Sequence, residues 1–297
     1  MIKRIVEIGS PARLSLSRKQ LKVEREEFAA ESLPVEDLGV LILDHPAIRP
    51  SQGLLSECMK NNVAVVMCDE KHLPASVLLP LDGHTLHSKI VKEQAAATPG
   101  RLSRLWRAIV RAKILAQADA LDAFEEYGEP LRAIAGRAGR ENPAQAEARA
   151  ARMYWPRMFG EDFRRNRALP GVNRLLNYGY SLIRAATARA IVAAGLHPAF
   201  GLHHHNQYDG FCLADDLMEP LRPLVDRRVR QMRDEPEAWG EELELEKEEK
   251  RELLGVLAED VNFGGKSYPI LTALQYYAAG VRRVVCGEEK ETEIPRP

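Results

Sequence analysis

The chain has 297 residues, of which 45% are apolar and 29% are charged, so it can fill the core of one large globular domain or two ordinary ones. Its formal net charge of −1 excludes a strongly basic or acidic protein, which leaves only the local distribution of charge to indicate a polyanionic partner. The four cysteines form no C-x-x-C pair, and the chain contains neither a secretory leader pattern nor an apolar run of about 18 residues, so we expect a cytoplasmic protein without disulfides, structural zinc or contact with a membrane.

The N-terminal part of the sequence has strand patterns. Short apolar or alternating runs bounded by turn residues predict strands over 2–8, 38–44 and 63–69, and a β-hairpin that turns at 18–20. Residues 51–61 instead carry apolar positions at helical spacing, with Ser51 as a candidate N-cap. We therefore expect a small β-rich unit with one helix.

The pattern changes to helical after residues 73–89, whose prolines and glycine predict a hinge. Apolar residues three and four apart predict helices over 103–121, 144–155 and 171–195. Strands followed by a run of helices indicate an α+β fold, with a β-rich domain over residues 1–84 and a larger all-α domain over residues 85–297. The acidic segment 241–252 is interpreted as a solvated helix face.

Residues 201–223, GLHHHNQYDGFCLADDLMEPLRP, concentrate side chains that can bind a metal ion. Three histidines are followed by Asp215, Asp216 and Glu219, and in a helix either aspartate can share a face with Glu219. Two neighbouring carboxylates repel unless a cation or a proton lies between them, and oxygen ligands with one imidazole suit Mg²⁺ or Mn²⁺. The alternative is that Asp215 caps the helix and the histidines are ordinary surface residues.

A second region carries a local excess of positive charge. From Arg149 to Arg189 there are nine arginines, no lysine and only two acids, with six aromatic residues interleaved. Arginine matches phosphate oxygens and aromatic rings stack on unpaired bases, so this pattern predicts a nucleic-acid surface. The alternative is that the aromatic residues are core and the arginines pair with the acidic segment 241–252. The arginines that we select for contact with DNA phosphates are Arg149, Arg152, Arg164, Arg165 and Arg167.

Two motifs together make the sequence recognisable. EARAARMYW (147–155) and GLHHHNQYDGFCLADDLMEPLRPLVD (201–226) resemble the Cas1 family of CRISPR-associated integrases and endonucleases, and LADDLMEPLRP resembles the branch of type II systems. The resemblance extends over essentially the whole chain, including VAVVMCDEKHLPASVLLP near the start. It implies a β-rich domain that dimerises and a helical catalytic domain, which inserts short foreign DNA fragments as spacers into a CRISPR array in antiviral defence.

The resemblance also implies particular site residues. Glu147, His204 and Glu219 are expected to be catalytic and to hold one Mg²⁺ or Mn²⁺ ion, since His204 stands fifteen residues before Glu219. His203 is the second candidate for the histidine ligand, and Asp216 is similar to an acid that supports the site. Consecutive residues of an extended loop project alternately, so the two neighbours of His204 are expected to point away from it.

The partners implied by the resemblance are prespacer DNA, the CRISPR repeat, a second copy of the chain, and a Cas2 dimer that bridges two such homodimers. Type II relatives additionally work with Cas9 and an end-binding accessory protein. Two other functions stay open. A nucleotide phosphohydrolase of the HD type requires an adjacent His-Asp pair, which this chain lacks, and a DNA-binding scaffold with a degenerate site has no support in the sequence.

Overall fold

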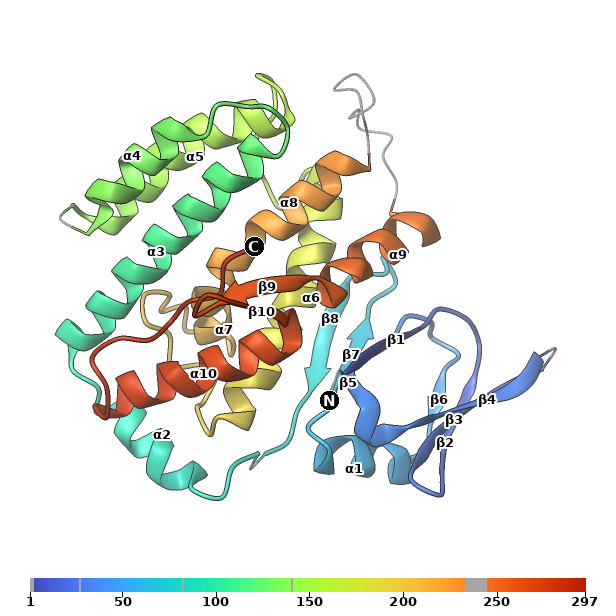
Figure 1. The fold of residues 1–297 in the computed structure, drawn as a ribbon. Coiled ribbons are helices and arrows are strands. Elements are labelled where there is room, and N and C mark those ends of the chain that lie inside the picture. Colours follow the sequence, from blue (N-terminus) through green and yellow to red (C-terminus); the bar gives the residue numbers. More distant parts are fainter. Residues whose placement is uncertain (1–2, 27, 82, 140, 233–244) are drawn as a thin grey trace.

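The computed structural model describes residues 3–26, 28–81, 83–139, 141–232 and 245–297. Strands dominate the N-terminal part of the chain and helices the remainder, as the sequence predicts (Figure 1). In chain order the N-terminal elements are β1 (Arg4–Ile8), β2 (Arg13–Ser17), β3 (Gln20–Arg25), β4 (Phe28–Pro34), η1 (Val35–Asp37), β5 (Leu38–Leu43), β6 (Arg49–Pro50), α1 (Gln52–Lys60), β7 (Ala64–Cys68) and β8 (Pro74–Leu78).

These strands form two sheets. One has the order β1-β5-β7-β8, in which the first three strands are parallel and β8 is antiparallel, and the other has the order β4-β3-β2-β6. The predicted hairpin is confirmed, because β2 and β3 pair from Ser17↔Gln20 onward. Its two turn residues, Arg18 and Lys19, have φ of 49° and 61°, the left-handed backbone of a two-residue hairpin turn. The predicted cap of α1 is also confirmed, since the Ser51 hydroxyl accepts a hydrogen bond from the backbone N–H of Leu54 at 3.3 Å.

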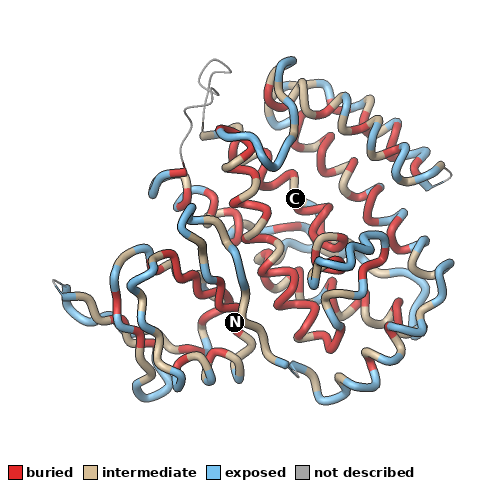
Figure 2. Tube along the Cα trace, turned by 180° about the vertical axis from the view of Figure 1, so that it is seen from behind, coloured by how far each residue is buried: buried red, intermediate tan, exposed pale blue. Residues whose placement is uncertain are grey.

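Strand β5 joins two hydrophobic cores. Val40 and Ile42 pack into the core of the helical part, whereas Leu41 and Leu43 pack into a smaller core with the second sheet and α1. Successive side chains of a strand point to opposite faces, which explains this alternation and the fully apolar sequence of β5. Figure 2 shows buried residues on both sides of this sheet, so the β-rich part and the helical part share one sheet as their boundary.

The remaining elements are mostly helical. They are α2 (His87–Ala95), α3 (Pro99–Asp122), α4 (Glu129–Ala138), α5 (Pro143–Phe159), α6 (Val172–Ala193), α7 (Cys212–Met218), η2 (Glu219–Leu221), α8 (Arg222–Gln231), α9 (Lys247–Gly255), η4 (Val256–Ala258), β9 (Asp260–Phe263), β10 (Lys266–Pro269) and α10 (Ile270–Cys286). Helix α6 lies at the centre and contacts α7, α8, α9, α10 and the sheet strands β7 and β8. An added Cβ on Gly179 of α6 would lie 2.4 Å from a methyl carbon of Val225, so glycine is what lets α6 and α8 pack this closely.

Two expectations from the sequence require correction. The predicted hinge at 73–89 contains β8, which pairs with β7 through Val65↔Leu78. The prolines had suggested an irregular segment, but Pro74 begins an edge strand, a position where a missing N–H is tolerated. The second part is also not all-α, because β9 and β10 form an antiparallel hairpin against α10. The division at residues 84 and 85 stays a prediction.

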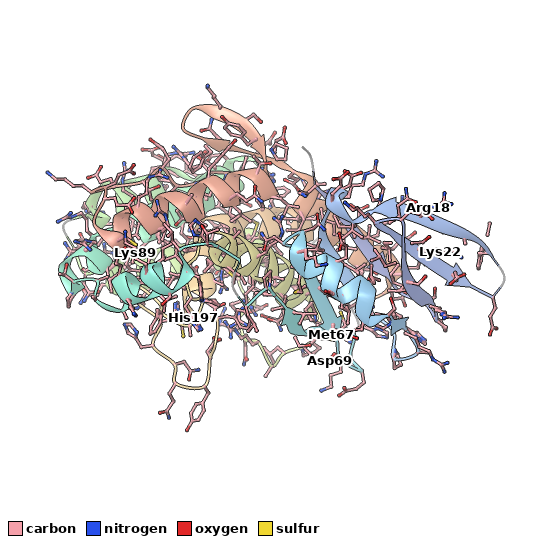
Figure 3. The ribbon with its side chains drawn as sticks, turned by 90° about the horizontal axis from the view of Figure 1, so that it is seen from below. Arg18, Lys22, Met67, Asp69, Lys89 and His197 are labelled. Carbon is pink, nitrogen blue, oxygen red and sulfur yellow. The ribbon has the colours of Figure 1, made fainter. Side chains whose placement is uncertain are left out.

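The β2–β3 hairpin and helix α2 lie at opposite ends of the molecule. Figure 3 shows Arg18 and Lys22 of the β2–β3 hairpin at the opposite end of the molecule from Lys89 on α2. Met67 at the end of β7 and His197 after α6 lie between these ends. No helix within the described residues is long and apolar enough to cross a membrane.

Candidate active site

Two acidic residues from different elements converge on one lysine. The Nζ atom of Lys113 on α3 lies 2.5 Å from Oε1 of Glu147 on α5 and 2.5 Å from Oε2 of Glu219 in η2. The side chain of Glu219 is only 5% exposed and that of Lys113 13%, whereas that of Glu147 is 30% exposed. The cluster therefore opens to solvent on the side of Glu147.

An arginine completes this cluster. Nε of Arg222, at the start of α8, lies 2.9 Å from the second carboxylate oxygen of Glu219, and its guanidinium also lies over the ring of Tyr180 at 4.6 Å. Burial opposes the ionised form of Glu219, but Arg222 and Lys113 outweigh it and lower the pKa of Glu219. Burial likewise opposes the charge of Lys113, but Glu219 and Glu147 outweigh it and raise the pKa of Lys113. These groups are therefore charged at neutral pH.

The prolines of the predicted helix explain the position of Glu219. Helix α7 ends at Met218, a 3₁₀ turn contains Glu219 and Pro220, and α8 begins at Arg222 and continues through Pro223. Each proline lacks a backbone N–H, so the chain cannot continue as one regular α-helix and tightens instead. This change of helix places Glu219 against α3.

Asp216 holds the histidine loop in place. Its buried carboxylate accepts hydrogen bonds from the backbone N–H groups of Leu202 at 2.5 Å, His203 at 3.0 Å and His204 at 3.4 Å. A fourth contact, at 2.6 Å, joins it to Nδ1 of the His204 ring. Gly201 permits this packing, because an added Cβ there would lie 2.3 Å from the carbonyl oxygen of His204.

The contact with Asp216 determines what His204 can do. It raises the pKa of His204 and engages Nδ1, and no described residue is hydrogen-bonded to Nε2. A carboxylate on one ring nitrogen orients a histidine whose other nitrogen binds a metal ion. Asp216 therefore holds the histidine loop and the His204 ring in position, and its supporting role in catalysis stays a prediction.

The ring of His203 does not point in the direction expected from the sequence. The ring of His203 stacks on Trp106 of α3, with centroids 4.6 Å apart, and the ring of His204 meets the same indole edge-on at 5.9 Å. The rings of His203 and His204 therefore lie together, 5.7 Å apart, and the prediction that they point away from each other is wrong. The loop is bent around Asp216, so the alternation of an extended strand does not apply. His205 is exposed.

The neighbouring acid, Asp215, pairs with an arginine. Oδ1 of Asp215 lies 2.7 Å from Nε of Arg184 on α6, and Asp209 contacts the same guanidinium at 2.6 Å. Asp215 does not cap the helix, because α7 begins after Phe211. The helical spacing had suggested that Asp215 or Asp216 could share a cation with Glu219, but Asp215 pairs with Arg184, whereas Glu219 pairs with Lys113 and Arg222. Glu219 is instead paired across space with Glu147.

A polar groove of about 440 Å³ lies next to Arg222 of this cluster. Its lining residues include Arg165, Arg167, Arg184, Tyr208 and Arg222. Arg222 contacts Glu219 as well, so the groove adjoins that carboxylate through Arg222. Tyr208 is 88% exposed, and its ring is available to a ligand in the groove.

The arginines selected from the sequence have different environments. Arg149 pairs with Glu141, and Arg164 donates to backbone carbonyl groups. Arg165 is half-buried and donates to the side chains of Asn173 at 2.9 Å and Asn177 at 2.8 Å.

Arg152 and Arg167 are exposed, and within the described part of the chain they have no ion-pair partner. Their contact with DNA stays a prediction. Residues 241–244 of the acidic segment lie outside the described residues, whereas Lys247–Gly255 forms helix α9.

The arrangement fits a divalent ion at the position of the Lys113 ammonium group. Two carboxylates already direct oxygens at one cation there, and the oriented ring of His204 is close enough for its charge to lower the pKa of Glu219. Oxygen ligands with one imidazole suit Mg²⁺ or Mn²⁺. As they stand, no three histidine, cysteine or acidic side chains among the described residues are grouped closely enough to hold a metal ion.

Three residues of this site were missed from the sequence. Lys113 and Trp106 lie on α3, far from both motifs, and an amphipathic helix gives no sign of which polar side chain enters a site. Arg222 could have been found, because it is three residues after Glu219, where a helical turn brings side chains together.

Comparison with known proteins indicates what this arrangement resembles. Residues 7–251 match the family model described as CRISPR associated protein Cas1. A curated relative from Neisseria meningitidis, named CRISPR-associated endonuclease Cas1, is 36% identical over 224 residues, which cover 75% of this chain and 73% of the relative.

Solved structures share the fold. A casposase bound to its integration product superposes with a TM-score of 0.78 at 18% identity, covering 98% of this chain and 92% of the casposase chain. A chain of a Cas6-RT-Cas1–Cas2 complex superposes with a TM-score of 0.74 at 16% identity, covering 97% of this chain and 35% of the larger one. At these identities the superpositions show a common fold and nothing further.

Proposed function

This chain belongs to the Cas1 family of CRISPR-associated proteins, and we propose that it is a metal-dependent DNA endonuclease and integrase that inserts short foreign DNA fragments as spacers into a CRISPR array. One observation carries the proposal for the site. Glu147 and Glu219, from separate elements, direct carboxylate oxygens at a single cation beside a histidine that Asp216 orients.

In this proposal Glu147, His204 and Glu219 hold one divalent ion, Mg²⁺ or Mn²⁺. Such an ion neutralises charge on a phosphate and lowers the pKa of an attacking hydroxyl group. The protein contributes the positions. Asp216 fixes the ring of His204, and Arg222 keeps Glu219 ionised and oriented.

The reaction that fits this site exchanges one phosphodiester bond for another. The 3′-oxygen of the incoming fragment forms a bond to phosphorus while the bond from phosphorus to the 3′-oxygen of the repeat strand breaks. The attacking hydroxyl loses its proton and the departing oxygen gains one, so the number of phosphodiester bonds does not change. Water in place of the 3′-hydroxyl gives cleavage, so one site supports both activities.

The groove beside the acidic pair is our candidate for the path of the DNA strand. Arg167 and Arg222 line it, and arginine contacts to phosphate fix the position of DNA without reading its bases. The exposed ring of Tyr208 can stack on an unpaired base at the end of a fragment.

We further propose that the protein acts in the cytoplasm as a homodimer, and that a Cas2 dimer bridges two such dimers on prespacer DNA and the CRISPR repeat. The fold shared with a chain of a Cas6-RT-Cas1–Cas2 complex and with a DNA-bound casposase supports this assembly. Cas9 and an end-binding accessory protein stay predictions from the resemblance to the type II branch.

A strand-transfer assay tests the proposal. Purified protein and its Cas2 partner are incubated with a supercoiled plasmid carrying one CRISPR repeat, a labelled duplex fragment, and Mg²⁺ or Mn²⁺. We expect labelled plasmid with a 3′-hydroxyl fragment and none with a 3′-dideoxy fragment, which lacks the nucleophile. Glu147→Gln should remove the product. Transfer that continues in the chelator EDTA, or with Glu147→Gln, would refute the proposed mechanism.

A further inference from the structure

The lysine between the two acids is not used by the proposed reaction. Lys113 is on α3, and its ammonium group contacts Glu147 and Glu219 at 2.5 Å each, so both carboxylates share one positive charge. A buried lysine that only stabilises a fold needs one acidic partner, as Lys250 has in Asp44. A lysine between two carboxylates carries one positive charge against two negative charges. A doubly charged ion at the same position would neutralise both carboxylates.

The charges of the cluster are balanced as it stands. Glu147 and Glu219 carry two negative charges, and Lys113 and Arg222 carry two positive ones. A divalent ion bound to the same acids would leave an excess of two positive charges in a largely buried space. Like charges held this close in a medium of low polarity repel strongly, so one cation has to leave.

Lys113 is the cation that can leave. Arg222 is fixed between Glu219 and the ring of Tyr180, and its guanidinium is rigid and planar. Lys113 has a flexible stem of four carbons, and among the described residues its ion-pair partners are the two carboxylates that the ion would bind. Carboxylate oxygens lie about 2.0–2.2 Å from such an ion, so an ammonium group 2.5 Å from the same oxygens cannot remain beside it.

We propose that the Lys113 ammonium group and the divalent ion are alternative occupants of one position between Glu147 and Glu219. This inference rests on the proposed metal site and adds a regulator to it. Lys113 keeps the two carboxylates together when no metal is bound, and it lowers the affinity for metal because it must be displaced. An apolar side chain of similar size at position 113 is therefore expected to raise the affinity of the site for the divalent ion.

Isothermal titration of Mn²⁺ into metal-free protein, without DNA, tests this. Lys113→Met is expected to bind Mn²⁺ about tenfold to a hundredfold more tightly than the unsubstituted protein, the scale of the charged hydrogen bonds that metal no longer has to break. Lys113→Arg keeps the charge and is expected to bind no more tightly than the unsubstituted protein. Lys250→Met removes another buried lysine and should leave the affinity unchanged.

Two further measurements secure the interpretation. Without Lys113 the acids repel, so Lys113→Met should unfold at a lower temperature in EDTA and gain more from added Mn²⁺ than the unsubstituted protein does. Lys113→Gln, which keeps a hydrogen-bond donor without charge, replaces Lys113→Met if that variant does not fold in EDTA, and it too should bind more tightly.

The outcomes separate the two proposals. Equal or weaker Mn²⁺ binding by the folded Lys113→Met or Lys113→Gln protein overturns this inference and leaves the metal site intact. If no protein binds Mn²⁺ in a manner that Glu147→Gln abolishes, the metal site itself is wrong, and the displacement of Lys113 falls with it.

Discussion

Lys113 and Lys250 both have largely buried side chains, and their surroundings differ. Lys250 on α9 contacts a single buried carboxylate, Asp44 at the end of β5, at 2.6 Å, and the other oxygen of Asp44 contacts His72 at 2.8 Å. Lys113 contacts two carboxylates that come from α5 and η2.

This difference separates a structural contact from a ligand site. The pair of Asp44 and Lys250 is balanced charge for charge and connects a strand to a helix, so nothing is gained by opening it. The pair of Glu147 and Glu219 converges from two directions on one point, has a solvent-exposed side, and adjoins a groove. The number of carboxylates that contact a buried lysine is therefore a better indication of a metal-binding site than the burial of that lysine.

We expect Lys250→Met to have the largest effect on the free energy of unfolding, because it removes the lysine that we interpret as structural. The substitution leaves the charge of Asp44 buried without its cation, which costs about 3–5 kcal/mol in the free energy of unfolding. Urea denaturation measures this loss, and strand transfer by the protein that remains folded should be unchanged. The double variant Asp44→Asn with Lys250→Met should lose less than Lys250→Met alone. An unchanged denaturation midpoint would show that this pair does not hold α9 against β5.

Another buried acid, Asp226 on α8, sharpens the comparison because its direct partners are neutral. It accepts hydrogen bonds from Tyr154 at 2.7 Å and from Tyr180, and burial raises its pKa to about 6. The folded state then binds a proton on Asp226 more tightly than the unfolded state. The contribution of Asp226 to stability is therefore fully present below pH about 4 and is lost as the pH rises to about 6, by about 3 kcal/mol in total.

Asp226→Asn is expected to remove this part of the pH dependence. The measurement is the free energy of unfolding of both proteins in urea at several values between pH 4 and 7, compared as a difference so that other titrating groups cancel. Parallel curves for the two proteins would contradict the raised pKa. Glu219, with Lys113 and Arg222 beside it, has a lowered pKa and should not contribute a loss of this sign.

Substitutions in the histidine loop should have a smaller effect, which is on the affinity of the proposed site for Mn²⁺. His204→Ala should weaken Mn²⁺ binding about a hundredfold, whereas His203→Ala, which removes a stacked ring but no proposed ligand, should change it by less than about tenfold. Calorimetric titration of both variants decides the assignment. A larger loss for His203→Ala would move the imidazole ligand by one residue and leave the acidic pair in place.

The smallest effect concerns the groove. Arg167→Ala should reduce the salt dependence of duplex DNA binding by roughly 0.9 units of log–log slope, the value for one phosphate contact. Arg18→Ala is the matched control, because Arg18 is an exposed arginine that does not line the groove and lies on the β2–β3 hairpin, at the end of the molecule opposite Lys89 (Figure 3). Equal slopes for the unsubstituted and Arg167→Ala proteins would remove this groove from the path of the DNA.

The sequence predicted the elements that depend on local patterns. Strand β5 is a continuous apolar run, the β2–β3 hairpin has regular alternation, and Ser51 caps α1, and all three are confirmed. Strand β8 was missed because its proline resembles a loop signal, and the β9–β10 hairpin because two four-residue strands give too short a pattern.

The candidate site was predictable only where it follows a motif. Glu147, His204, Asp216 and Glu219 lie within the two motifs, and the supporting role that the resemblance implies for Asp216 stays a prediction. Lys113 was not predictable, because it enters the site through the packing of α3 against α5 and η2, and nothing in the local sequence records that packing.

Strand β5, with side chains in two cores, limits how this protein can be divided. A fragment that starts at residue 85 would lack Val40, Ile42, Ala64 and Val66, which complete the helical core. The face of α6 that contacts β7 and β8 would then meet water, and such apolar surfaces promote aggregation. The same constraint applies to chimaeras, since a sheet taken from a relative must bring with it the helix surface that matches its inward-facing residues. The β-rich part and the helical part are therefore expected to be inherited and exchanged as a unit.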